Sequence, residues 1–173
     1  VEKFFLTGYP APEEIRKKLS NNHLPQFREA NGHIHTPYSF SSFPDMSTIF
    51  SMAKNESIAV LGINDFFVAD GFREFIDGSL RNKVFPLFNI EFIGLLKEEQ
   101  KNGIRINDPN NPGRIYFSGK GFDYPFKPGF LNGLKLKSVV RESQNQIKAM
   151  ITKLNGLIEP VDPSLALSYD KIK

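Results

Sequence analysis

The sequence has 173 residues, of which 40% are hydrophobic and 24% charged, as expected of a globular chain with a real core rather than a disordered one. Its 22 basic and 19 acidic residues are spread along the chain without the dense basic cluster of a nucleic-acid surface, so nucleic acid is not indicated as a partner. No cysteine is present, which excludes disulfides, thiol catalysis and thiolate metal sites. Any metal must therefore bind through His, Asp or Glu.

The length fits a single α/β domain over residues 1–173, and no apolar run approaches the ~18 residues that a membrane span requires. No membrane association is predicted. The chain begins with Val1 rather than methionine, so removal of an upstream segment is compatible with the sequence. The compartment therefore stays open, with the cytoplasm favoured.

The first half of the chain alternates between helical and strand patterns. Residues 11–19 have Pro12 and two acids near their start and bases near their end, which matches the helix dipole and predicts a short helix. His23 follows in a loop context and is left out of the functional site. The further elements predicted in this half are a strand ending near residue 35, a helix over 46–55, a buried strand over 58–63, a helix over 69–80 and a strand region over 84–94.

Two of the three histidines, His33 and His35, form an H-x-H pair at the end of the first of these strands. Side chains two residues apart in a strand project from one face, so both imidazoles can face one ion or phosphate while Ile34 packs on the other side. Pro37 ends the strand because proline has no N–H for a ladder. The alternative is a pair of hydrogen-bonded surface histidines without a ligand.

Acidic residues recur at the ends of the next two strands. Asp65 follows the strand over 58–63 and Glu91 lies in the strand region over 84–94. The interval from His35 to Asp65 is 30 residues and that from Asp65 to Glu91 is 26, each the size of a βαβ unit. Right-handed crossovers bring successive strand ends to one rim of a sheet or barrel. We therefore expect His33, His35, Asp65 and Glu91 to converge.

The second half of the chain has a different pattern. A strong turn signal at residues 108–113 separates strand-like residues 103–106 and 114–117, which predicts a β-hairpin excursion near 103–117. Lys120 lies in a glycine-rich loop over 118–121 and is a candidate anion contact, although the loop lacks the spacing of a phosphate-binding loop. The longest helical signal covers residues 131–157, with an end or a kink at Asn155 and Gly156. Residues 164–173 resemble the start of another element.

Three motifs in order resemble the first part of a known family. They are His33-Ile34-His35-Thr36 with the following Pro37-Tyr38-Ser39, the apolar strand that ends Gly62-Ile63-Asn64-Asp65, and the strand that carries Glu91. Over residues 28–94 this order and spacing resemble the PHP (polymerase and histidinol phosphatase) family. The resemblance implies a distorted (β/α)7 barrel, of which this chain would form the N-terminal portion, with up to three divalent metals at its C-terminal rim and hydrolysis of phosphate esters as its activity.

The resemblance also implies roles for individual residues. His33, His35 and Glu91 would be ligands of a divalent metal such as Zn, Mn or Fe. Asp65 would match the acid of the family's Asp-His pair, as a further ligand, a bridging or orienting group, or the catalytic base. Arg73 and Lys120 are candidate phosphate contacts, although the sequence does not place either of them in the site.

The sequence departs from the family pattern at several ligand positions. The histidine expected after Asp65 is Phe66, a further ligand of the first motif falls near Ser41, and no histidine follows His35. We therefore expect partial or absent metal occupancy. The chain is interpreted as the front part of a longer domain in preference to a degenerate family member.

Two functions stay open at this point. The first is a metal-dependent phosphoesterase acting on a small phosphorylated substrate, with little activity in this chain alone. The second is a non-catalytic PHP-like module that binds one ion or none and serves a partner. A two-His-one-carboxylate iron oxygenase is disfavoured because those enzymes use an all-β framework. Exposed strands also favour a homodimer.

Overall fold

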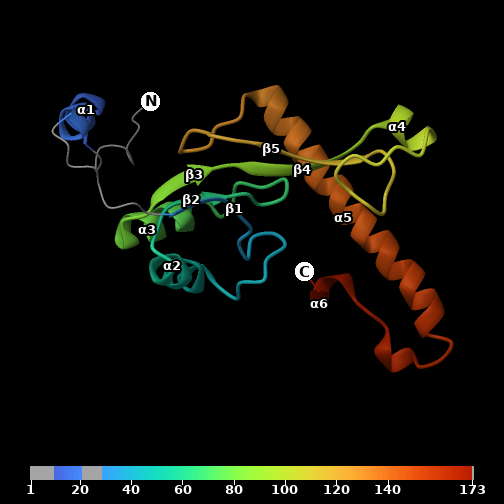
Figure 1. Ribbon diagram of the computed structural model, residues 1–173. Helices are drawn as coiled ribbons and strands as arrows, with labels where there is room; N and C mark the ends of the chain where they lie inside the picture. Colours follow the sequence, from blue (N-terminus) through green and yellow to red (C-terminus); the bar gives the residue numbers. More distant parts are fainter. Residues whose placement is uncertain (1–9, 21–28, 173) are drawn as a thin grey trace. The chain divides into compact units, whose positions relative to one another are not determined.

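Figure 1 presents a computed structural model that describes residues 10–20 and 29–172. The described part of the chain is mixed α/β, with 44% of its residues in helix and 19% in strand. It divides into two compact units, residues 1–127 and 128–173. The α/β class is confirmed. The strands of the described ranges do not close into a barrel, and both the barrel and the single domain over 1–173 stay predictions.

The first unit alternates strands and helices as the sequence predicts. Asp45 caps the second helix by accepting a 2.7 Å hydrogen bond from the N–H of Thr48, and the third helix ends at Lys83 in a left-handed conformation with φ of 55°. The elements of this unit are α1 (Pro12–Ser20), β1 (Glu29–Ile34), α2 (Met46–Asn55), β2 (Ile58–Ile63), α3 (Phe72–Asn82), β3 (Phe85–Phe88), β4 (Ile90–Leu95), α4 (Lys97–Lys101) and β5 (Arg114–Gly119).

The strands β1, β2 and β3 form a parallel sheet in that order, with α2 and α3 as the two crossovers. Gly78 of α3 lies directly against the ring of Phe50 of α2, so both helices pack on the same face of the sheet (Figure 1). The hydrophobic core fills the space between this face and the helices. Its buried members are Ile34, Met46, Ile49, Phe50, Ala53, Leu61, Ile63, Phe72, Phe75, Ile76, Val84, Phe88 and Ile90.

The predicted strand region over 84–94 is divided at Asn89. Before this residue β3 pairs with β2, and after it β4 pairs antiparallel with β5 in a second sheet. The hairpin predicted near 103–117 is therefore wrong in its pairing. Residues 103–106 are not a strand, and the backbone N–H and carbonyl of Tyr116, which a hairpin partner would use, bond the side chain of Asn107 instead.

The second unit consists of α5 (Phe130–Ile158), a 3-10 turn (Pro163–Leu165) and α6 (Tyr169–Ile172). The long helix is confirmed, and it continues past Asn155 and Gly156 to Ile158. None of its side chains is buried. In the described part of the chain, every helix is too short or too polar to cross a bilayer.

The neighbouring strands β1 and β2 approach each other closely at two glycines. A Cβ on Gly62 would collide with the backbone carbonyl of Gly32 and lie 2.9 Å from the side-chain amide of Asn89, whereas a Cβ on Gly32 would meet nothing within 4 Å. We expect Gly62→Ala to lower the free energy of unfolding by about 1–3 kcal/mol, as overpacking does, and Gly32→Ala to leave it near the wild-type value. Urea denaturation followed by circular dichroism measures both. Equal stability of the two variants would contradict the close approach.

Candidate metal centre

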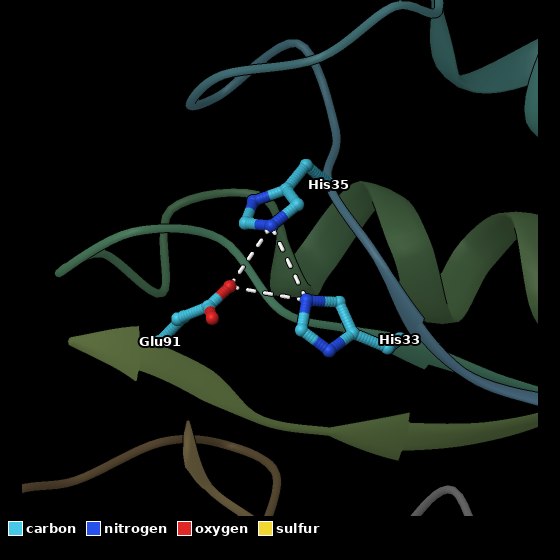
Figure 2. A group of neighbouring side chains, drawn as sticks. All are labelled: His33, His35 and Glu91. Carbon is cyan, nitrogen blue, oxygen red and sulfur yellow. Dashed lines mark hydrogen bonds and ion pairs between the residues drawn. The ribbon is translucent and has the colours of Figure 1, made fainter. Parts of the chain in front are cut away.

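His33, His35 and Glu91 point toward one another, as Figure 2 shows. The Oε2 atom of Glu91 lies 3.0 Å from Nε2 of His33 and 2.9 Å from Nε2 of His35, and the two Nε2 atoms are 3.3 Å apart. Residues 58 positions apart in the sequence thus contribute three ligand-type atoms to one small triangle. The predicted convergence of these three residues is confirmed.

The backbone ladder explains how Glu91 reaches the histidines. The N–H of Asn64 donates to the carbonyl of Ile34 (2.7 Å), which fixes the end of β1 beside the end of β2. The N–H of Glu91 donates to the carbonyl of Asp65 (3.0 Å), and the N–H of Phe67 donates to the carbonyl of Glu91 (2.9 Å). The parallel pairing therefore continues past β2 and β3, and it delivers Glu91 to the same rim as the histidines.

The triangle has the dimensions of a metal-binding face. Ligand atoms bound to one ion at 2.0–2.1 Å are about 3.0 Å apart at right angles and about 3.3 Å apart in a tetrahedron. The separations of 2.9–3.3 Å agree with both arrangements. Two imidazoles and a carboxylate are also a suitable donor set for Zn, Mn or Fe. The residues present therefore fit a single divalent ion.

The three side chains differ in exposure, and this gives the site an open side. Glu91 is 9% exposed and His35 is 19% exposed, whereas His33 is 47% exposed. The carboxylate is enclosed by protein, and solvent reaches the site past His33. A ligand from solution would approach from that side.

Asp65 does not join this group of ligand atoms. Its Oδ1 atom accepts hydrogen bonds from the N–H of Thr36 (2.7 Å) and the hydroxyl of Ser39 (3.1 Å), and its Oδ2 atom accepts one from the hydroxyl of Thr36 (2.6 Å). Burial raises the pKa of Asp65, while the hydrogen bonds from Thr36 and Ser39 and the charge of His35 oppose this shift. Both carboxylate oxygens of Asp65 therefore accept hydrogen bonds from the loop that follows β1.

Phe66 occupies the position at which the family pattern has a histidine. Its ring stacks on His35 with centroids 4.7 Å apart and an interplanar angle of 28°, and it also lies near the ring of Tyr116, with centroids 6.3 Å apart. A phenyl ring offers no lone pair to a metal. It covers one face of His35 with apolar surface instead.

Two polar residues beside the triangle, Asn64 and Ser118, were not among the site residues predicted from the sequence. The buried amide of Asn64 donates to the hydroxyl of Ser118 (2.7 Å), and its nitrogen lies 3.4 Å from Nε2 of His33. Ser118 pairs with Glu91 in the register of β4 and β5. Asn64 directly follows the apolar strand over 58–63, and this position at a strand end could have identified it as a candidate site residue.

The remaining predicted residues lie at different places. Lys120 is exposed beside the site, with Nζ 3.3 Å from the carbonyl oxygen of Gly32 and 3.5 Å from Oδ1 of Asn64. Arg73 is exposed on α3, and no contact in the described part of the chain joins it to the triangle. Ser41 uses its hydroxyl to donate to the backbone carbonyl of His35 (2.9 Å). His23 lies outside the described residues.

Comparison of the chain with protein-family models, with curated proteins and with solved structures gives no match. The resemblance to the PHP family therefore depends on the order and spacing of its motifs, and it stays a prediction.

Thr36 is fully buried and supplies two of the donors to Asp65, so its hydroxyl can be tested by an isosteric change. We expect Thr36→Val to cost about 1.5–3 kcal/mol of stability near neutral pH, because a buried carboxylate oxygen loses its donor, and Thr36→Ser to cost much less. Urea denaturation measures both variants.

The loss in Thr36→Val should depend on pH. The pKa of Asp65 is raised in the folded protein, and losing a donor raises it further, so the folded variant holds the proton more readily than the unfolded chain. The extra instability is therefore small where the carboxyl is protonated in both states, and it grows as the pH rises through the folded pKa. Losses of equal size at about pH 4 and about pH 7 would contradict this account.

Proposed function

We propose that this chain forms the metal-binding front part of a PHP-type phosphoesterase, which acts on small phosphorylated substrates. The observation that carries the proposal is the triangle of Nε2 of His33, Nε2 of His35 and Oε2 of Glu91, three ligand atoms at separations of 2.9–3.3 Å. Its members come from the motif positions at which the family resemblance implies metal ligands.

The arrangement of the strands supports the fold part of the proposal. Sequential order β1-β2-β3, with both crossover helices packed on one face, is the arrangement found in the wall of a (β/α) barrel, whereas doubly wound sheets carry helices on both faces. The candidate site lies at the C-terminal ends of the strands, where barrel enzymes place their chemistry. We infer that the described sheet corresponds to the first strands of such a barrel.

His33, His35 and Glu91 would hold one divalent ion, Zn, Mn or Fe. A bound divalent ion supplies Lewis acidity and lowers the pKa of a coordinated water to ~7. The residues of the chain provide the rest of the environment. Lys120 offers a positive charge beside the site, suited to a phosphate group, and Asp65 supports the loop after β1 instead of contacting the substrate.

A second function is favoured by one specific observation. The ring of Phe66 stacks on His35 where the family resemblance implies a ligand, so the side chains of residues 10–20 and 29–172 provide for one ion and not for a cluster. Two ions together can clamp the attacking and the leaving oxygen of phosphoryl transfer, and one ion cannot do both. A non-catalytic PHP-like module that binds a single ion is therefore the alternative function.

Metal binding is the first test of the proposal. We expect titration calorimetry with Zn or Mn to give at most one ion per chain, and His35→Ala or Glu91→Gln to weaken the binding by at least about 100-fold, because each removes one of three ligands. His23→Ala is the matched control, since it removes the one histidine outside the triangle. Two or three tightly held ions after dialysis would show that the ligand set is larger than proposed.

Phosphoesterase activity separates the two functions. We expect the chain with Mn or Zn to hydrolyse a generic aryl phosphate slowly, and the His33→Ala, His35→Ala double variant to lose the part of the rate that depends on metal. Release of the aryl alcohol measures the rate. Equal background in both proteins would reject catalysis in this chain and favour the binding module.

A further inference from the structure

The strand that supplies Glu91 continues beyond it as an apolar surface. Figure 2 shows that Glu91 leaves its strand on the side of the two histidines. Side chains two residues apart in a strand share a face, so Ile93 and Leu95 lie on the same face of β4 as Glu91. At about 3.4 Å per residue they follow Glu91 at about 7 Å and about 14 Å along the strand. Both are open to solvent, since Ile93 is 38% exposed and Leu95 is 51% exposed.

The neighbouring strand β5 extends this surface back to the candidate metal centre. Tyr116 is opposite Ile93 in the pairing of β4 with β5, and opposite residues of an antiparallel pair have their side chains on one face. The ring of Tyr116 lies 6.3 Å from that of Phe66, and Phe66 stacks on His35 at 4.7 Å. Phe66, Tyr116, Ile93 and Leu95 therefore form a row that begins at a ligand histidine. We call this row the apolar strip.

Charged groups mark the far end of the apolar strip. Arg114 is opposite Leu95, and its guanidinium lies 3.4 Å from the carboxylate of Asp108. Residues 91–95 and 114–118 are all described, and on this face they carry no charged side chain between Glu91 and Arg114. The strip is therefore uncharged from the metal centre to Arg114, over about 14 Å.

Hydrogen-bonding groups along the strip already have partners in the protein. The hydroxyl of Tyr116 donates to Asp108 (3.4 Å), and its backbone N–H and carbonyl bond the side chain of Asn107. A ligand with hydroxyl groups would lose bonds to water here without gaining new ones, which costs free energy. A ligand with an apolar body would instead cover the exposed side chains of Ile93 and Leu95, which favours binding.

We propose that the apolar strip binds the alcohol part of a phosphate ester whose phosphate group lies at the metal centre beside Lys120. The substrate class is then a phosphate monoester of an alkyl or aromatic alcohol, in preference to one of a sugar or another polyol. This inference rests on the proposed function for the position of the phosphate. It adds the nature of the group that the phosphate carries, because one molecule can reach both the metal centre and the strip.

Alkylphosphonates test the strip, because they carry the headgroup of a phosphate ester and are not hydrolysed. We expect the chain loaded with Mn to bind octylphosphonate at least about 10-fold more tightly than ethylphosphonate, since each methylene that is covered strengthens binding by about two- to fourfold. Titration calorimetry measures both affinities. Equal affinities of the two phosphonates would overturn the inference.

The Ile93→Ser, Leu95→Ser double variant should lose this advantage of the longer chain. Phe117→Ser is the matched control, because Phe117 is also 51% exposed but lies on the opposite face of the same two strands, stacked on Phe92. It should keep the advantage. Circular dichroism checks that each variant folds, and a folded double variant with the full wild-type advantage would overturn the inference.

Methyl NMR of the metal-free wild type needs no variant and separates this inference from the proposed function. We expect millimolar octylphosphonate to shift the methyl signals of Ile93 and Leu95 and not those of Leu80, which is 41% exposed on α3. If these shifts appear in a chain that binds no metal, the proposed function fails and the strip stands. If metal binds but Ile93 and Leu95 shift no more than Leu80, the strip fails and the metal site stands.

Discussion

The burial of Ile34 between two histidines is the constraint on which the candidate site depends. Ile34 is 8% exposed in the core, so the residues on either side of it must project from the opposite face of β1. A shift of one residue in the pairing would expose Ile34 and turn both imidazoles into the core. Because the N–H of Asn64 also bonds the carbonyl of Ile34, the placement of His33 and His35 follows from hydrophobic packing and the backbone ladder.

The carboxylate of Glu91 reaches the histidines because residues 85–95 belong to two sheets, first as β3 and then as β4. At Asn89 the chain leaves the parallel sheet and enters the antiparallel one, yet Glu91 keeps its backbone bonds to the strand extension after β2. The buried amide of Asn89 donates to the carbonyl of Gly32 and accepts from the N–H of Gly121. A polar side chain buried at this depth has to be hydrogen-bonded. Its two bonds therefore tie β1 and the glycine-rich loop to the point where the chain changes sheets.

Local patterns in the sequence predicted the parts of the fold that local physics determines. Hydrophobic periodicity predicted the helices and the apolar strand over 58–63. The spacing of the strand ends predicted that His33, His35 and Glu91 converge, since successive parallel strands end at one rim. The pairing of residues 114–119 with β4 is a long-range choice that the strong turn signal at 108–113 does not reveal. Asp65 lies at the expected strand end but outside the group of ligand atoms, because strand-end spacing gives the location of an acid but not the donors that bond its oxygens.

The surroundings of the triangle bear on whether it holds an ion for chemistry or for structure. Structural sites surround their metal with four protein ligands, whereas catalytic sites use three and keep a position open. Here three ligand atoms converge, Phe66 closes one side with a ring that cannot coordinate, and the other side is open past the half-exposed His33. Low exposure of Glu91 strengthens its attraction for a cation, while the open side leaves the site accessible from solution. This combination favours an exchangeable position on the ion over a closed structural site, and it gives the phosphoesterase proposal more weight than the binding module.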